Sequence, residues 1–406
     1  MKKHLKLIAL SVLMILFLGT AVQVQAQETT EITVWHYFAD SEGMEWLVED
    51  FNENNSDIKV DSRYVHFSEL ENQITKGIMT GDLPDVLIFG TDTMARWADN
   101  GALADLTERA EEWGKEDKFY EGAWESGIYK ERLFAIPQNI NALSIFYNKE
   151  LFAEAGLEGE PKNWEELREY AEKISDLGEK THGLTFSATK DETGSFQFAP
   201  FLWQAGGSFE ELDSDASKSA MKLWQDMLEN GYTPKSVLNT PQYELAVNFA
   251  SGNVGMMVNG PWALSAFDEA DFDYGVFKMP VKEGVDKPTS VLGGESLAIS
   301  RTSENKEAAW EFIKYFQKPE TIKEWCKIEN RIPARKDVVK DTPAWSEDEI
   351  MQVFTEQLED TVARPVHPEY SEMSSALQTA IQESLTGSDV EEAMDKAADK
   401  VDSVLE

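Results

Sequence analysis

Aromatic rings and carboxylates recur at the points where short apolar segments of this sequence end. They are His36 and Tyr37 after segment 31–35, Asp92 after segment 86–89, and Trp262 after segment 254–258. A flat ring can cover the apolar C–H face of a pyranose, and carboxylates accept hydrogen bonds from the hydroxyls on its rim. These residue types therefore suit the binding of a polyhydroxylated molecule such as a sugar.

The spaced motifs on which much hydrolytic and nucleotide chemistry depends are missing from the sequence. It contains no HExxH, no GxSxG, no Walker-type loop and no spaced Cys/His set. Asp92 and Glu295 could form the carboxylate pair of a glycoside hydrolase, but among 75 acidic residues an arbitrary pair carries little weight. We therefore expect no catalytic residues, and a glycoside hydrolase is the alternative from another class.

Segment 213–217 begins like a calcium-binding loop, with acidic residues at alternate positions. The sixth and twelfth places of such a loop require Gly and Glu, and here they are Lys218 and Trp224. We expect a helix start at this point, no metal site and no cofactor.

The segments before the candidate site residues read as strands separated by helices. Segment 86–89 is a continuous apolar run, which is typical of a strand covered on both faces in a parallel sheet. Strands at 31–35 and 58–65 precede it, each followed by a helical pattern, and this order favours a largely parallel sheet. Ligands bind at the carboxyl ends of such strands. Thr91 or Asp92 could equally cap the next helix, which does not exclude ligand contact.

The chain has 406 residues, which is too long for one ordinary core and suits two lobes. We expect an α/β fold in which each lobe is a mixed, mainly parallel sheet flanked by helices. The expected ranges are 27–138 with 292–338 for the first lobe, and 139–291 with 339–406 for the second. The hinge is expected near 137–139 and 291–293, where strands cross between the lobes.

Residues 1–26 read as a signal peptide. Lys2, Lys3 and Lys6 make a basic start, an apolar run follows, and Ala26 ends a small-residue cleavage site. A retained membrane anchor is the alternative. Because Gln27 rather than cysteine follows that site, a freely soluble periplasmic or extracellular protein is favoured over a lipoprotein.

The formal net charge of the whole chain is −38. Removal of Lys2, Lys3 and Lys6 with the signal peptide would change it to −38 − 3 = −41. Such a charge argues against nucleic acid or anionic lipid as a partner. Cys326 is the single cysteine, so no internal disulfide can form, and we expect it to be a small core residue.

Five short motifs follow one another along the chain. They are Gly-Asp-x-Pro-Asp-Val at 81–86, Asn-Gly-Ala-Leu at 100–103, Tyr-Asn-Lys at 147–149, Asn-Gly-Pro-Trp at 259–262 and Gly-Gly-Glu-Ser at 293–296. In this order they resemble the family 1 extracellular solute-binding proteins of bacterial ABC transporters, in particular the group that binds maltose and oligosaccharides. The resemblance covers nearly all of the mature chain. It implies a type II-like periplasmic binding protein fold with a hinge and a ligand cleft between the lobes.

The resemblance also implies site residues at the matching positions of this sequence. Asp92 matches the family's sugar-binding aspartate, and Trp262 matches its stacking tryptophan. Phe89 lies where the maltose-binding members have a cleft tryptophan, and Gly294 and Glu295 lie where the chain re-enters near the cleft.

Two further aromatic residues are candidates with less direct support. Trp203 is a pocket wall or a core tryptophan, and Tyr370 lies near Ser374, which takes the place of a further stacking tryptophan of the family. The departures at Phe89 and Ser374 argue against maltose itself as the ligand.

The resemblance implies a secreted, monomeric receptor that binds a neutral sugar, in particular an oligosaccharide, and delivers it to the permease subunits of an ABC transporter in the membrane. The alternative ligand is glycerol phosphate or another small polar solute. A phosphate would require a cationic side chain or a helix N-terminus in the cleft. The strand-end motifs contain no such side chain, and the sequence alone does not place Arg331 and Arg335.

Overall fold

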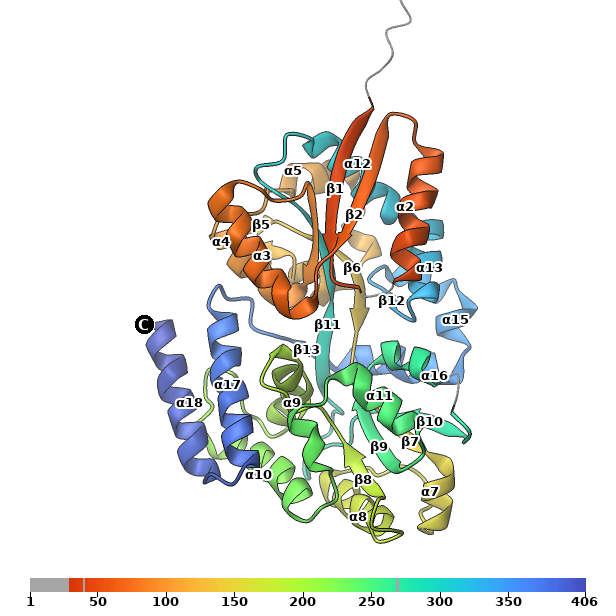
Figure 1. Ribbon diagram of the computed structural model, residues 1–406, viewed down its shortest axis with the longest axis vertical. Coiled ribbons are helices and arrows are strands. Elements are labelled where there is room, and N and C mark those ends of the chain that lie inside the picture. The colour runs from red at the N-terminus through yellow and green to blue at the C-terminus, as the bar shows by residue number, and fades with distance from the viewer. Residues whose placement is uncertain (1–28, 39–40, 268–269) are drawn as a thin grey trace, which may run out of the picture.

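The structure is a computed structural model that describes residues 29–38, 41–267 and 270–406. The expected signal peptide, 1–26, lies outside the described residues. The chain forms two α/β lobes, one above the other in Figure 1, each built around its own sheet. The predicted class, an α/β fold of two lobes, is therefore confirmed.

The first sheet lies in the upper lobe of Figure 1 and has seven strands. In spatial order they are β12 (Ile332–Pro333), β6 (Ile136–Asn141), β11 (Ser290–Ile299), β3 (Val86–Gly90), β1 (Thr30–His36) and β2 (Ile58–Tyr64), with β13 (Thr361–Ala363) paired to β11. Strand β1 runs parallel to β2 and β3, as the sequence pattern predicts. Strand β11 runs antiparallel to both β3 and β6, so the sheet is mixed.

The second sheet corrects the prediction that both sheets are mainly parallel. Its four strands, in spatial order, are β10 (Tyr274–Phe277), β7 (Ser144–Asn148), β9 (Val254–Asn259) and β8 (His182–Thr185). Strand β7 is antiparallel to both of its neighbours, and only β8 and β9 run parallel. Periodicity along one strand shows which side chains are buried but not the direction of its neighbour, which explains this error. A short ribbon of β4 (Ile128–Tyr129) and β5 (Arg132–Leu133) completes the strands of the described chain.

Helices cover both sheets. Those associated with the first sheet are α2 (Glu42–Asn54), α3 (Phe67–Thr80), α4 (Met94–Asp99), α5 (Thr107–Trp113), α6 (Glu121–Glu125), α12 (Lys306–Phe316), α13 (Pro319–Ile328) and α14 (Lys336–Lys340). Those around the second sheet are α7 (Lys149–Glu154), α8 (Trp164–Ser175), α9 (Glu192–Gln204), α10 (Asp215–Glu229), α11 (Gln242–Ala250), α15 (Pro343–Ser346), α16 (Glu349–Gln357), α17 (Tyr370–Leu385) and α18 (Val390–Leu405).

Local sequence signals explain where several of these helices begin. The side chain of Asn163 accepts a hydrogen bond from the Glu166 amide at 2.9 Å and so caps α8. The helix start expected at segment 213–217 is confirmed, because this segment opens α10, whose cap is Ser214. Asp389 caps α18, because its side chain accepts a hydrogen bond from the Glu392 amide at 3.1 Å.

Two strands carry the chain between the lobes. The predicted lobe boundaries at 138/139 and 291/292 fall inside β6 and β11, whose pairing shifts register between Glu295 and Ser296. Near the crossing, Gly294 has a φ of +144°, and a Cβ there would lie 2.2 Å from the Asn139 carbonyl oxygen. Only glycine fits this close approach of two backbones. The lobe boundaries themselves stay a prediction.

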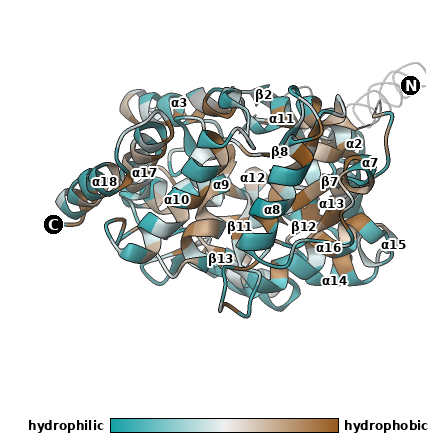
Figure 2. Cartoon of the chain, turned by 90° about the horizontal axis from the view of Figure 1, so that it is seen from below, coloured by the Kyte–Doolittle hydropathy of each residue, from teal (hydrophilic) through white to brown (hydrophobic). Residues whose placement is uncertain are grey.

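The lobes have dense aromatic cores, with hydrophilic residues on outer helices such as α8 (Figure 2). Cys326 is fully buried in the first-lobe core, and burial raises the pKa of its thiol well above the usual range. Its expected role as a small core residue is confirmed. Within the described ranges, no helix is both long enough and apolar enough to cross a membrane.

Candidate functional site

A pocket of about 300 Å³ lies between the two lobes. Its walls combine aromatic rings, carboxylates and two arginines from both sheets and from the crossing strands. The lining residues are Tyr37, Phe67, Gly90, Asp92, Asn141, Glu192, Thr193, Phe196, Pro241, Gln242, Tyr243, Trp262, Gly293, Gly294, Glu295, Arg331 and Arg364. Five of the nine candidate residues from the sequence are brought together here: Tyr37, Asp92, Trp262, Gly294 and Glu295.

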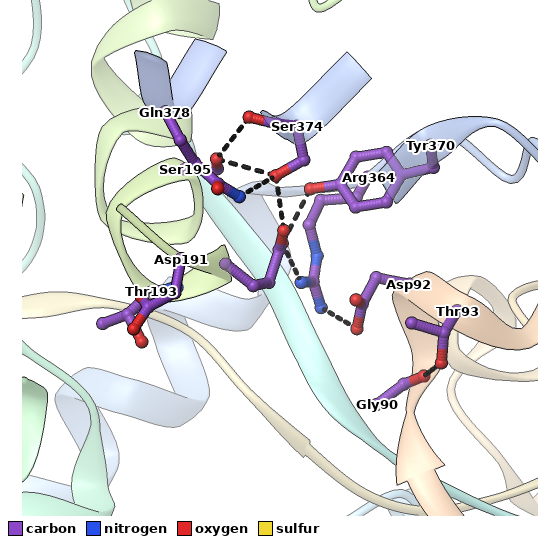
Figure 3. Close-up of polar contacts among 11 residues, drawn as sticks. Gly90, Asp92, Thr93, Asp191, Thr193, Ser195, Arg364, Tyr370, Ser374 and Gln378 are labelled. Atoms are coloured by element: carbon purple, nitrogen blue, oxygen red, sulfur yellow. Dashed lines mark hydrogen bonds and ion pairs between the residues drawn. The ribbon is translucent and has the colours of Figure 1, made fainter. Parts of the chain in front are cut away.

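Asp92 forms part of an ionic network on one wall of the pocket (Figure 3). Its Oδ1 lies 3.2 Å from Nη2 of Arg364, whose Nη1 lies 2.6 Å from Oε1 of Glu192. The short helix α4 shows no side-chain cap from Asp92 or Thr91, so the capping interpretation is not needed for either residue. Gly90 leaves room for the carboxylate, because a Cβ at that position would lie 2.4 Å from Asp92 Oδ1.

Glu192 lies in the first turn of α9 and is tied to α17 by two hydroxyl groups. Tyr370 donates a hydrogen bond to its Oε1 at 2.7 Å, and Ser374 donates one to its Oε2 at 2.5 Å. Burial raises the pKa of the Glu192 carboxyl to about 7, although Arg364 acts in the opposite direction. This wall therefore binds its carboxylates to protein donors and leaves them little net charge.

A second buried ion pair also lines the pocket. Nη1 of Arg331 lies 3.2 Å from Oε1 of Glu295, and the Tyr37 hydroxyl donates a hydrogen bond to the same oxygen at 2.7 Å. Burial is the largest influence and disfavours the charge of Arg331, but Glu295, Tyr37 and Glu329 together outweigh it and raise the arginine pKa. Burial, followed by the Glu295 charge, raises the pKa of Tyr37 well above its usual range.

Trp262 supplies the largest flat surface of the pocket. It follows β9 through the Asn-Gly-Pro turn and belongs to a short 3₁₀ segment, Pro261–Ala266. Its ring lies against Gly260, where a Cβ would come within 2.1 Å of the ring carbons, so the turn glycine makes space for it. The ring of Phe196 lies 6.4 Å away, and the Arg331 guanidinium lies 5.9 Å from the indole centroid.

Four sequence candidates lie outside the pocket lining. Phe89 is buried in the first lobe, because the alternation of side chains along β3 directs it, with Leu87, to the face of the sheet that is covered by the cluster containing Trp97. Trp203 packs at the edge of the second-lobe core beside Phe209. Tyr370 is buried and contacts the pocket residues Glu192 and Arg364 without lining the pocket itself.

His36 is the fourth of these residues. It is buried, its ring stacks on Phe38 at 5.9 Å, and burial lowers its pKa from 6.5 to about 4. Between pH 6.5 and 4 the His36 imidazole therefore binds a proton more readily in the unfolded chain than in the folded protein. The folded protein should lose stability as the pH falls through this range.

We expect a His36→Asn variant to lose less stability over this range, as measured by urea unfolding at several pH values. If the stability of both proteins changed equally with pH, His36 would not be buried in its neutral form.

Three important site residues were not predicted or not placed. Arg364 and Glu192 were missed, and Arg331 was noted without a location; all three line the pocket. Arg335 is buried in the first lobe, where it pairs with Asp337 at 2.6 Å and donates to the Gln317 carbonyl. The one sequence signal for Arg364 was that it is an isolated basic residue between β13 and α17.

A larger and more open hollow of about 880 Å³ lies on the first lobe, between α2 and α12. Its Tyr315 ring packs edge-on against Phe51, and the hydroxyl donates to Asp50 at 2.5 Å. The walls belong to one lobe, so they cannot close on a ligand, and we place the candidate site in the interlobe pocket. Among the described residues, no group of acidic, histidine and cysteine side chains is arranged to bind a metal ion.

Two α/β lobes joined by crossing strands, with a polar and aromatic pocket between them, define the class of two-lobe binding proteins. The chain belongs to the bacterial extracellular solute-binding protein family, whose model matches residues 46–353. This membership confirms the family to which the sequence motifs pointed. The family consists of binding proteins rather than enzymes.

Similar proteins have names that refer to sugars. The chain is 27% identical over 371 residues to a maltotriose-binding protein of Pyrococcus abyssi, covering 87% of this chain and 77% of that one. It is 25% identical over 383 residues to a galactooligosaccharide-binding protein of Bacillus subtilis, covering 91% and 88%. Its fold resembles an ABC transporter solute-binding protein of Thermotoga lettingae bound with α-D-tagatose, with a TM-score of 0.85, 27% identity, and coverage of 93% and 100%.

Proposed function

We propose that this protein is a secreted, monomeric receptor that binds a neutral sugar, in particular an oligosaccharide, in the interlobe pocket and delivers it to the permease subunits of an ABC transporter. The observation that carries the proposal is the composition of the pocket. A wide indole face lies between carboxylates whose charges are balanced by arginines. Such a surface suits a solute with an apolar face and hydroxyl edges. The names of the similar proteins support the same ligand class.

Glycerol phosphate is the second candidate, because Arg331 and Arg364 both reach the pocket. Each arginine is already paired with a carboxylate, at 3.2 Å and 2.6 Å respectively. A phosphate would have to approach Asp92, Glu192 and Glu295 as well, and like charges repel at short range. The pairing therefore favours a neutral solute.

A thermal-shift panel tests the proposal with purified mature protein. The panel contains maltotriose, a galacto-oligosaccharide mixture, α-D-tagatose and glycerol 3-phosphate. A ligand at about 100 times its Kd should add roughly 2.7 kcal/mol to the free energy of unfolding. Chromatography after long incubation should return the bound sugar intact, whereas cleavage would indicate a glycoside hydrolase. Stabilisation by glycerol 3-phosphate alone would replace the sugar proposal with the second candidate.

The lobes are proposed to comprise 27–138 with 292–338 and 139–291 with 339–406, and to close on the ligand about the crossing strands. Asp92 and Trp262 then belong to different lobes, and a sugar gripped by both favours the closed form. A shift from 1% to 99% closed requires about 5.5 kcal/mol of differential binding.

We expect small-angle scattering of the mature protein to give a smaller radius of gyration with a saturating panel sugar than without it, because the closed form is more compact. Sedimentation of the same samples should give the monomer mass, which separates closure from dissociation. Identical scattering curves at proven saturation would exclude a large closure.

A further inference from the structure

Arg364 forms ion pairs with carboxylates from both lobes. It follows β13, the three-residue strand that runs parallel to Ser290, Val291 and Leu292 of the crossing strand β11. In Figure 3 its side chain extends between the segment bearing Tyr370 and the turn bearing Asp92. It pairs with Asp92 at the end of β3 and with Glu192 at the start of α9.

The surroundings of the guanidinium make this bridge rigid. The Arg364 side chain is only 6% exposed, and those of Asp92 and Glu192 are 11% and 19% exposed. The ring of Phe196 lies 5.0 Å from the Arg364 Cζ on one side and that of Tyr370 lies 6.0 Å away on another. The planar fork of arginine can satisfy two carboxylates at fixed positions, which a lysine ammonium cannot do in the same way.

We propose that Arg364 is the positioning residue of the binding site: it fixes the carboxylates of Asp92 and Glu192, one from each lobe, in the arrangement that receives the hydroxyl groups of the ligand. The inference rests on the proposed sugar-binding function. Asp92 and Glu192 each contact Arg364 through one oxygen, and both residues also line the pocket. Arg364 thereby lowers the repulsion between two carboxylates that would otherwise lie close together in the pocket without a cation.

A double-mutant cycle tests the bridge. Its variants are Arg364→Met, which keeps the length of the side chain without its charge, Asp92→Asn, which keeps the shape of the carboxylate, and the double variant. Calorimetry uses maltotriose, or the panel sugar that stabilises the wild-type protein most. Each single variant should bind about 10- to 100-fold more weakly, as expected for the loss of a charge-assisted contact. The double variant should bind about as weakly as the weaker single variant, because the two residues act as a unit.

Two further variants separate positioning from a general effect on folding. Arg364→Lys should recover part of the lost affinity, because its ammonium group can pair with only one carboxylate. Arg168→Met is the matched control, because the Arg168 guanidinium pairs with Asp226 at 2.6 Å within the second lobe. This variant should bind the sugar with wild-type affinity. The proposal would be overturned if Asp92→Asn and Arg364→Met both bound the sugar with wild-type affinity. It would also be overturned if the fold-losses of affinity in the two single variants multiplied in the double variant.

The bridge can also be tested without a sugar, so its failure is distinguishable from failure of the proposed function. In urea unfolding of the ligand-free proteins, the double variant should lose less stability than the sum of the losses of the two single variants, because Asp92→Asn removes one of the carboxylates that Arg364→Met leaves unpaired. Independent, additive shifts of the midpoint would contradict the bridge even if a sugar binds. If no panel sugar binds the wild type while the midpoints are coupled, the sugar-binding function and the positioning role fail, and only the ionic bridge stands.

Discussion

Replacing Trp262 by alanine is expected to weaken binding of the identified sugar about 30- to 1000-fold. The change removes the widest flat surface of the pocket, and the loss of its buried area and stacking corresponds to roughly 2–4 kcal/mol. Because Trp262 is only partly buried, the variant should remain folded. Isothermal calorimetry of the wild-type and variant proteins gives the affinities directly.

Trp203→Ala is the matched control for this experiment. Trp203 is also partly buried and in the second lobe, but it packs against Phe209 outside the pocket. We expect it to lower thermal stability while leaving the affinity unchanged. If the Trp262 variant bound the sugar normally, or if both variants lost affinity equally, the stacking role of Trp262 would be wrong.

Replacing Arg331 by leucine is expected to destabilise the protein by about 3 kcal/mol or more. The substitution leaves the Glu295 carboxylate, only 6% exposed, without its cation. The remaining hydrogen bond from the Tyr37 hydroxyl does not balance a buried charge. The effect should appear as a lower urea midpoint in the ligand-free protein.

A second substitution should restore most of that stability. In Arg331→Leu/Glu295→Gln the buried charge is gone, and the glutamine oxygen can still accept from Tyr37. Arg132→Leu, which breaks an exposed pair with Asp105, is the control and should change stability by less than about 1 kcal/mol. A double variant as unstable as the single variant would show that the arginine acts through packing rather than charge.

Local patterns were sufficient to predict the strands that position the pocket. The apolar run before Asp92 is the strand β3, and the Asn-Gly-Pro turn does place Trp262 in the pocket wall. Phe89 shows the limit of the same method. A strand buried on both faces gives no alternation, so the sequence cannot show which neighbours face the ligand. In the structure Gly90, not Phe89, reaches the pocket.

The ionic bridge could not be predicted from local patterns at all. Arg364 and Glu192 are 172 positions apart, and neither belongs to a repeating pattern that signals contact. Glu192 follows the cap Asp191 and looks like an ordinary acidic residue in a first helical turn. Long-range pairing of this kind is fixed by the packing of whole elements, here α9, α17 and the crossing strand β11.

The buried state of Cys326 makes this chain a convenient starting point for a fluorescent sensor. Labelling reagents react with exposed thiolates, and the one native thiol is fully buried with a raised pKa. A cysteine introduced at Tyr243, which lines the pocket and is 63% exposed, would therefore be the preferred site of attachment. A dye on that side chain would lie at the mouth of the cleft, where its brightness should report occupancy, and the native sequence would need no other change.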